Sequence, residues 1–264
     1  MSIAPIAPQR RHTLRFLEEI RSFSPVFLGA DADAGRILEH RAAAKEQGRR
    51  YSVVTYILYT AARVLAAHPE ANAAIKGGLR PKVARFDTVN AKLTLDRTMS
   101  GQRIVLSAVL PALHTAGLDE VQELVDRLVA GDAESMPEFG GARLLQKLPT
   151  VPGRLAFRLG VRPLRSRADR FGTFAVTSLG HRPVDDFYSV GGTTVTLGIG
   201  RIADRPVVRD GVVTAAKVLR FTVTFDHRVI DGAEAADVVA DLVTALENFS
   251  ADAPVPTPRE ASLT

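Results

Sequence analysis

Apolar residues recur with helical spacing in three parts of the chain. A helix over residues 52–68 is indicated by one such stripe, and Pro69 ends it. Its apolar positions are Val53, Ile57, Ala61, Val64 and Leu65. Residues 119–129 repeat the pattern with Val121, Leu124, Val125 and Leu128. A third stripe near the C-terminus consists of Ala235, Val238, Val239, Leu242 and Leu246.

Alternation of apolar and polar side chains predicts strands elsewhere. In residues 194–199, Val195, Leu197 and Ile199 alternate with threonine and glycine, and residues 219–225 alternate in the same way. Both segments are therefore predicted to be half-buried strands. Because helical and strand signals follow one another without repeats, the sequence indicates a mixed α/β fold.

The composition is that of an ordinary globular protein, with 46% hydrophobic and 24% charged residues among 264. The chain has no cysteine, so disulfides, zinc–thiolate sites and a thiol nucleophile are excluded, and any thiol must come from a ligand. Neither a signal peptide nor a stretch of about 20 apolar residues is visible, and we expect a cytoplasmic protein. Residues 1–10 and 250–264 are expected to be flexible.

The formal charge of +5 is concentrated in one segment. Residues 143–170 carry eight basic side chains and one acid, Asp169, interleaved with leucines. This segment is either a solvated basic face beside buried leucines or a docking surface for phosphate, an acidic carrier protein or an anionic membrane. Poor aromatic interleaving and the absence of a recognition motif make nucleic acid the weakest of these partners. We expect neither nucleic-acid binding nor membrane contact.

His227 lies where the last strand pattern ends and the last helical pattern begins. Loops at strand ends often present catalytic groups, and imidazole suits proton transfer near neutral pH. Asp231 with Glu234 fits a capping box, which would stabilise the helix by about 1 kcal/mol without any catalytic role. No metal site is expected because no second histidine lies at ligand spacing, and a serine triad lacks its Gly-x-Ser-x-Gly turn. The remaining histidines are interpreted mostly as surface or capping residues: His12, His40, His68, His114 and His181.

Three segments resemble one enzyme family. Residues 222–233, TVTFDHRVIDGA, resemble the active-site signature of dihydrolipoamide acyltransferases, the acyl-transfer component of 2-oxo-acid dehydrogenase complexes. Residues 172–180, GTFAVTSLG, are similar to the family segment GTFTISNLG, and residues 196–202, TLGIGRI, to its ILGVG strand. A looser similarity covers residues 51–74. The resemblance therefore predicts an acyltransferase catalytic domain over residues 11–249.

The resemblance implies the fold of chloramphenicol acetyltransferase, an α/β two-layer sandwich of a mixed sheet with helices. It implies that His227 takes the proton of a thiol and that Thr177, where the family usually has serine, donates a hydrogen bond to the oxyanion. Asp231 would hold the loop by capping and ion pairing. The resemblance also implies a homotrimer with sites shared between subunits. Coenzyme A, as a substrate, would contact Ser178, Arg228 and Gly232, with Ser178 as the second choice for the oxyanion donor.

Departures from the family pattern leave the acceptor open. The chain begins almost directly at the catalytic part, so we expect no lipoyl group on it, and residues 250–264 lack the apolar knob that builds cubic cores. A lipoyl domain or an acyl-carrier protein could dock on residues 143–170. One alternative is a condensation-type transfer to an amine or hydroxyl, although Asp226 stands where those enzymes have a second histidine. The other is a non-catalytic trimeric scaffold.

Overall fold

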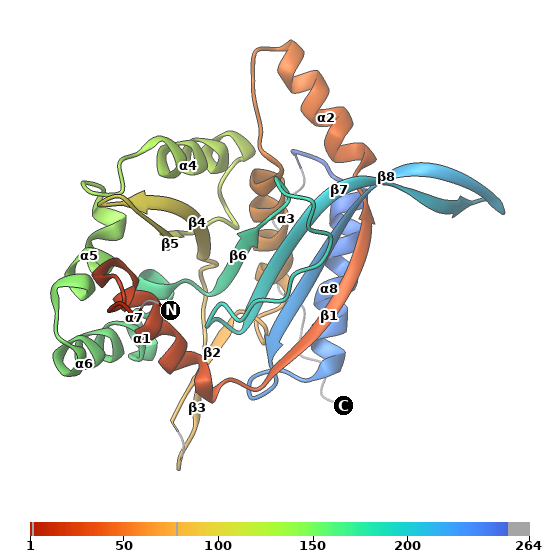
Figure 1. Cartoon of the computed structure of the whole chain (residues 1–264). Coiled ribbons are helices and arrows are strands. Elements are labelled where there is room, and N and C mark those ends of the chain that lie inside the picture. Colours follow the sequence, from red (N-terminus) through yellow and green to blue (C-terminus); the bar gives the residue numbers. More distant parts are fainter. Residues whose placement is uncertain (2, 78, 253–264) are drawn as a thin grey trace.

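The computed structural model describes residues 1, 3–77 and 79–252. Its centre is a six-stranded mixed sheet with the strand order β1-β8-β7-β6-β4-β5 (Figure 1). The strands are β1 Pro25–Asp33, β4 Ala91–Met99, β5 Gln102–Leu110, β6 Phe174–Ser178, β7 Val195–Arg209 and β8 Val212–Asp226. A separate hairpin joins β2, Ala73–Lys76, to β3, Lys82–Arg85.

Two long helices pack side by side on one face of the sheet (Figure 1). They are α3, Val53–Ala67, and α8, Gly232–Glu247, with α2, Gly35–Glu46, and α4, Leu118–Ala130, at the edge of this layer. Ser52 begins α3 by accepting a hydrogen bond from the Thr55 backbone N–H, which satisfies one of the free donors of the first turn. All three predicted helices are confirmed, and so is the two-layer α/β arrangement.

The predicted strand segments are buried on both faces at residues 195–199 of β7 and 221–225 of β8, so the prediction that they are half-buried was wrong. Thr196, Thr222 and Thr224 are at most 3% exposed, although they alternate with the apolar core residues. The loop before β7 covers two of them: the Thr222 hydroxyl donates to the Phe187 carbonyl oxygen at 2.6 Å, and the Thr196 hydroxyl accepts from the Gly191 backbone N–H at 3.0 Å. A threonine hydroxyl with such a partner can be buried at small cost.

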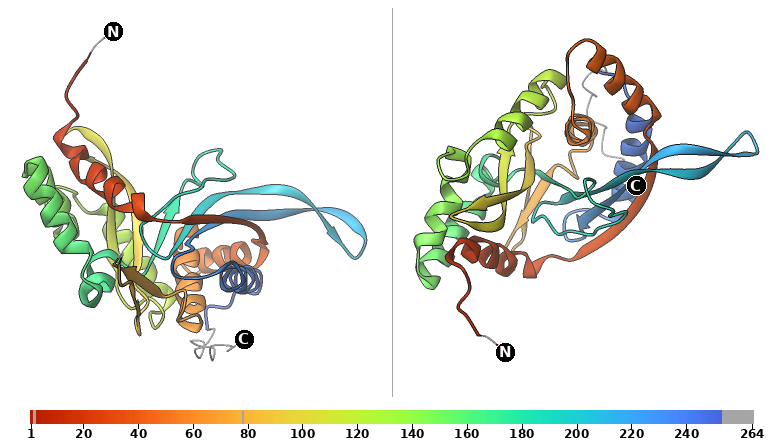
Figure 2. Two further views of the ribbon diagram at one scale, coloured as in Figure 1. Left: turned by 90° about the horizontal axis from the view of Figure 1, so that it is seen from below. Right: turned by 45° about the horizontal axis from the view of Figure 1, so that its top comes forward.

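A helical lobe lies at the other end of the sheet from β1 (Figure 2). It contains η1 Pro8–Arg10, α1 Arg11–Glu19, η2 Ile20–Ser22, η3 Pro137–Phe139, α5 Gly140–Lys147, α6 Thr150–Val161 and α7 Leu164–Phe171. Arg15 is 5% exposed, and its guanidinium donates to the carbonyl oxygens of Leu145 and Leu148. These bonds attach α1 to the connection between α5 and α6.

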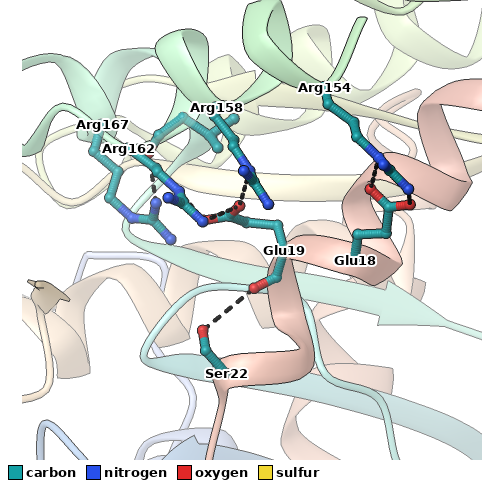
Figure 3. A network of polar contacts seen from close by, with 8 residues as sticks. Glu18, Glu19, Ser22, Arg154, Arg158, Arg162 and Arg167 are labelled. Atoms are coloured by element: carbon teal, nitrogen blue, oxygen red, sulfur yellow. Dashed lines mark hydrogen bonds and ion pairs between the residues drawn. The ribbon is translucent and has the colours of Figure 1, made fainter. Parts of the chain in front are cut away.

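The basic segment 143–170 forms α5 to α7, and its leucines are not buried. Leu144, Leu155 and Leu159 are 56–62% exposed, which corrects the reading of a basic face beside buried leucines. Several cations are paired within the chain instead. The Arg154 guanidinium binds Glu18 at 2.5 Å, and that of Arg162 binds Glu19 at 2.7 Å (Figure 3).

The hairpin of β7 and β8 extends beyond the body of the protein (Figures 1 and 2). Val208, Val212 and Val213 near its tip are 66–70% exposed. No helix in the described part of the chain is long and apolar enough to cross a membrane. Within the same residues no group of three or more histidines and acids could hold a metal ion. Of the predicted C-terminal tail, residues 253–264 lie outside the described residues.

Candidate active site

His227 occupies the turn between β8 and α8, as predicted. Its backbone N–H donates to the Ser24 carbonyl oxygen at 2.9 Å, which fastens the turn to the segment before β1. The side chain is 45% exposed, and its Nδ1 lies 3.3 Å from Asp231 Oδ1. With Nδ1 engaged, Nε2 is the ring nitrogen that can accept a proton from a substrate.

An ion pair between Arg228 and the buried carboxylate of Asp226 stabilises this turn. Asp226 is 2% exposed, and its Oδ1 accepts from Arg228 Nε at 2.8 Å and from the backbone N–H of Arg228 at 3.2 Å. The Arg228 guanidinium also lies over the Phe23 ring, 4.9 Å from its centroid. Arg228, predicted to contact coenzyme A, thus has a structural partner inside the chain. Gly232 is exposed at the first turn of α8.

Asp231 begins α8 without capping it. It occupies the N-cap position with extended backbone angles, but its side chain makes no capping hydrogen bond. The capping box was wrong, because Glu234 Oε1 instead lies 2.8 Å from His68 Nδ1, and Asp241 lies 2.9 Å from the other ring nitrogen. His68 is 2% exposed, so it is a core residue joining α3 to α8 and not a surface histidine.

Thr177 and Ser178 lie at the C-terminal end of β6, where both are half-buried. They line a cavity of about 1120 Å³. The chain leaves β6 through Gly180, where a Cβ would come within 2.6 Å of the Gly200 carbonyl oxygen, so glycine is needed at this close approach. The apolar wall of the cavity includes Leu38, Val53, Val54, Leu93, Leu95, Ile104, Val125 and Val129.

The cavity beside Thr177 also has basic side chains that no sequence pattern revealed. Arg10, Arg41, Arg103 and Arg182 line it, together with His181. Arg103 is neutralised by Asp96, whose pKa is lowered by the hydrogen bond from Arg103. These arginines come from four separate segments, so only the fold brings them together.

The structure does not bring Thr177 and His227 together within one chain. Thr177 pairs with Gly198 and through it with Thr222, which is four residues before the end of β8 at Asp226. That separation corresponds to about 13 Å along the strand, with two further strand spacings of about 4.8 Å across the sheet. The strand positions that carry the two predicted catalytic residues are therefore far beyond contact distance of each other within one chain.

The segment that contains the turn of His227 is similar to known acyltransferases. The model of the 2-oxoacid dehydrogenases acyltransferase family, catalytic domain, matches residues 164–251, which include β6, β7, the turn of His227 and α8. This match covers 88 of the 264 residues, about a third of the chain. A dihydrolipoyllysine-residue acetyltransferase component of the pyruvate dehydrogenase complex from Staphylococcus aureus is 48% identical over 52 residues. That match spans 20% of this chain and 12% of the relative's length.

Solved acyltransferase structures share the fold over almost the whole chain. A probable dihydrolipoamide acetyltransferase from Listeria monocytogenes has a TM-score of 0.71 at 16% identity, covering 97% of this chain and 98% of that chain. The dihydrolipoamide acetyltransferase of Azotobacter vinelandii also has a TM-score of 0.71, at 19% identity and with 94% and 92% covered. The acyltransferase fold therefore extends through the helical lobe to the N-terminal part.

Proposed function

We propose that this protein is a coenzyme A-dependent acyltransferase that moves an acyl group between coenzyme A and a thiol acceptor. The observation that carries the proposal is the exposed His227 on a turn held by the Asp226–Arg228 pair, inside the matched segment. The acceptor would be of the dihydrolipoamide type or bound to a carrier. Because the chain has no cysteine, both thiols come from the substrates.

The proposed reaction needs one base and one oxyanion donor. A free thiol has a pKa near 8.5 and is mostly protonated at neutral pH, so Nε2 of His227 takes its proton. The thiolate attacks the thioester carbonyl carbon, and the Thr177 hydroxyl donates a hydrogen bond to the oxyanion. Collapse of the intermediate breaks the original carbon–sulfur bond. The departing thiolate then receives the proton from the imidazolium of His227.

The separation of the two side chains supports a shared site. A cyclic homotrimer would bring the His227 turn of one subunit to the Thr177 cavity of the next, and so unite two residues that are apart within a single chain. Asp226 is neutralised by Arg228, so it is not available as a second base of the condensation type. Both features favour acyl transfer to a thiol in a site formed between two subunits.

The cavity beside Thr177 is the proposed site for coenzyme A. Its apolar wall suits the pantetheine arm, while Arg10, Arg41 and Arg182 suit the phosphates at the mouth. Ser178 lies next to Thr177 on the same strand end, and Gly232 and Arg228 would approach from the neighbouring subunit. A lipoyl domain or acyl-carrier protein would dock on residues 143–170. Arg154, Arg158 and Arg162 already pair with Glu18 and Glu19, so the exposed Lys147, Arg165 and Arg170 are the cations that would meet that partner.

The decisive experiment compares two histidines. His227→Ala should lower the rate of acyl exchange between acyl-coenzyme A and dihydrolipoamide by about 10²–10⁴-fold, as loss of a general base does. His181→Ala is the matched control, because His181 lines the Thr177 cavity of the same chain and is the base that a single-chain site would use. A larger loss in the His181 variant would contradict the proposed roles. Circular dichroism checks that both variants are folded.

A further inference from the structure

A second cavity, of about 360 Å³, borders the turn that carries His227. Asp226 and Arg228 line it from the turn, and Ser22 and Phe23 line it from the segment before β1. Thr177 and Ser178 do not contribute to its wall, so it is separate from the cavity proposed for coenzyme A. The acyl-transfer steps described above leave it unused.

The wall of this cavity has an excess of positive charge. Four basic side chains and two carboxylates line it: Lys76, Arg162, Arg167, Arg228, Glu19 and Asp226. Both carboxylates already have partners, because Glu19 binds Arg162 at 2.7 Å and Asp226 binds Arg228 at 2.5 Å (Figure 3 for Glu19). Lys76 and Arg167 make no direct ion pair with either carboxylate of this wall, although Glu19 and Asp226 attract the charge of Arg167 from a longer distance.

Arg167 is held in a fixed position. Its guanidinium donates to the carbonyl oxygens of Val161 at 2.5 Å and Gly192 at 2.6 Å and lies over the Phe171 ring. Figure 3 shows it beside Arg162, at the end of the network that joins α6 and α7 to α1. Burial lowers the pKa of Arg167 because water is removed from its charged form. A cation that is fixed and partly desolvated attracts an anion more strongly than a solvated surface arginine does.

We propose that this cavity binds a dianionic phosphate group, with Arg167 and Lys76 as its principal partners. The charge excess of two matches a dianion, and guanidinium and ammonium groups are the usual protein ligands of phosphate. The volume accommodates a phosphate together with a small attached group. The phosphate belongs either to a free phosphorylated compound or to the 3′-phosphate of a coenzyme A bound in the Thr177 cavity of a neighbouring subunit, where Arg10, Arg41 and Arg182 would then take the pyrophosphate.

Inorganic phosphate is the first probe, titrated by calorimetry against chloride at matched ionic strength. Lys76→Gln should weaken phosphate binding about tenfold, as loss of one charge-assisted contact does. Lys82→Gln is the control: Lys82 pairs with Lys76 across the β2–β3 hairpin and does not line the cavity. We expect phosphate affinity in this variant to equal that of the wild type. On α7, Arg167→Gln should abolish binding, while Arg165→Gln, an exposed arginine of the same helix, should not.

The outcome that overturns the proposal is absence of phosphate binding, or equal weakening of phosphate binding in the Lys76 and Lys82 variants, which would reveal general charge screening.

The source of the phosphate is assigned by comparing coenzyme A with dephospho-coenzyme A. If Lys76→Gln weakens only coenzyme A, the cavity takes its 3′-phosphate. If both are unaffected while inorganic phosphate is weakened, the ligand is a separate phosphorylated compound. Phosphate binding is measured without turnover, so its failure is distinct from failure of the acyltransferase proposal.

Discussion

His227 Nδ1 faces the Asp231 carboxylate at 3.3 Å across the proposed catalytic turn. The carboxylate is 88% exposed, so solvent screens the pair strongly. Because of this exposure, the effect of replacing Asp231 distinguishes two possible roles of its carboxylate. A carboxylate whose interaction is screened by water contributes little, whereas one that fixes the tautomer and orientation of the imidazole contributes nearly as much as the base itself.

We expect Asp231→Asn to lower kcat by only about twofold to fivefold, which corresponds to an exposed ion pair. Steady-state kinetics with acyl-coenzyme A and dihydrolipoamide would measure it. Asp237→Asn serves as the control, because Asp237 is exposed on the same helix α8 and has no contact with His227. A loss as large as that of His227→Ala would instead show that Asp231 fixes the tautomer and orientation of the His227 imidazole.

Thr177→Val should lower kcat by about 10²-fold with little change in the affinity for coenzyme A. Valine keeps the shape of threonine and removes only the hydroxyl, so an interaction made in the transition state is lost while ground-state binding remains. Ser178→Ala removes the neighbouring hydroxyl and should retain most activity. If the two variants exchange these results, the donor is Ser178, which lines the same cavity.

Lys92 is predicted to make stability depend on pH. It is 5% exposed, its amine donates to the Gly191 carbonyl oxygen, and it lies 3.8 Å from the centroid of the Phe171 ring. Burial, with a smaller contribution from the Arg167 charge, lowers its pKa from 10.5 to about 7. Between these values the unfolded chain binds the proton more tightly than the folded protein does. The free energy of unfolding therefore rises as the pH increases from 7 toward 10.

Lys92→Met removes this titration and keeps an unbranched side chain of similar length. Urea unfolding at pH 7 and pH 9.5 should show the wild type gaining stability relative to the variant at the higher pH. Lys82→Met, at an exposed position, should follow the wild type at both values. If the free energies of unfolding of the wild type and Lys92→Met differ by the same amount at both pH values, the amine does not titrate in this range.

The sequence predicted those parts of the fold that depend on local periodicity. The helices α3, α4 and α8 and the turn of His227 follow from apolar spacing over a few residues. The failures have non-local causes. Glu234 does not cap α8, because His68 reaches it from 166 residues away, and Thr222 is buried because the carbonyl of Phe187 covers it. The cavity lined by Lys76 of β2 and Arg167 of α7 could not be predicted either, because segments that are distant in the sequence form it.

The shared site predicts that two inactive variants restore activity when mixed. His227→Ala subunits keep an intact Thr177, and Thr177→Ala subunits keep an intact His227. After both are unfolded and refolded together, each mixed trimer has one junction at which an intact His227 faces an intact Thr177. With random equal mixing about three quarters of the trimers are mixed and each has one active site of three, so activity should recover to about a quarter of the wild-type value.

Mixing His227→Ala subunits with the double variant His227→Ala/Thr177→Ala is the control, because no junction then contains an intact His227. Native mass spectrometry of isotope-labelled subunits would show whether the trimers have exchanged. Recovery in the first mixture and none in the second requires the catalytic groups to come from different subunits. If exchanged trimers stay inactive, Thr177 and His227 do not share a site between subunits. They cannot share one within a single chain either, because about four residues of strand, roughly 13 Å, and two strand spacings separate them in the sheet. The oxyanion donor would then be sought near His227 itself.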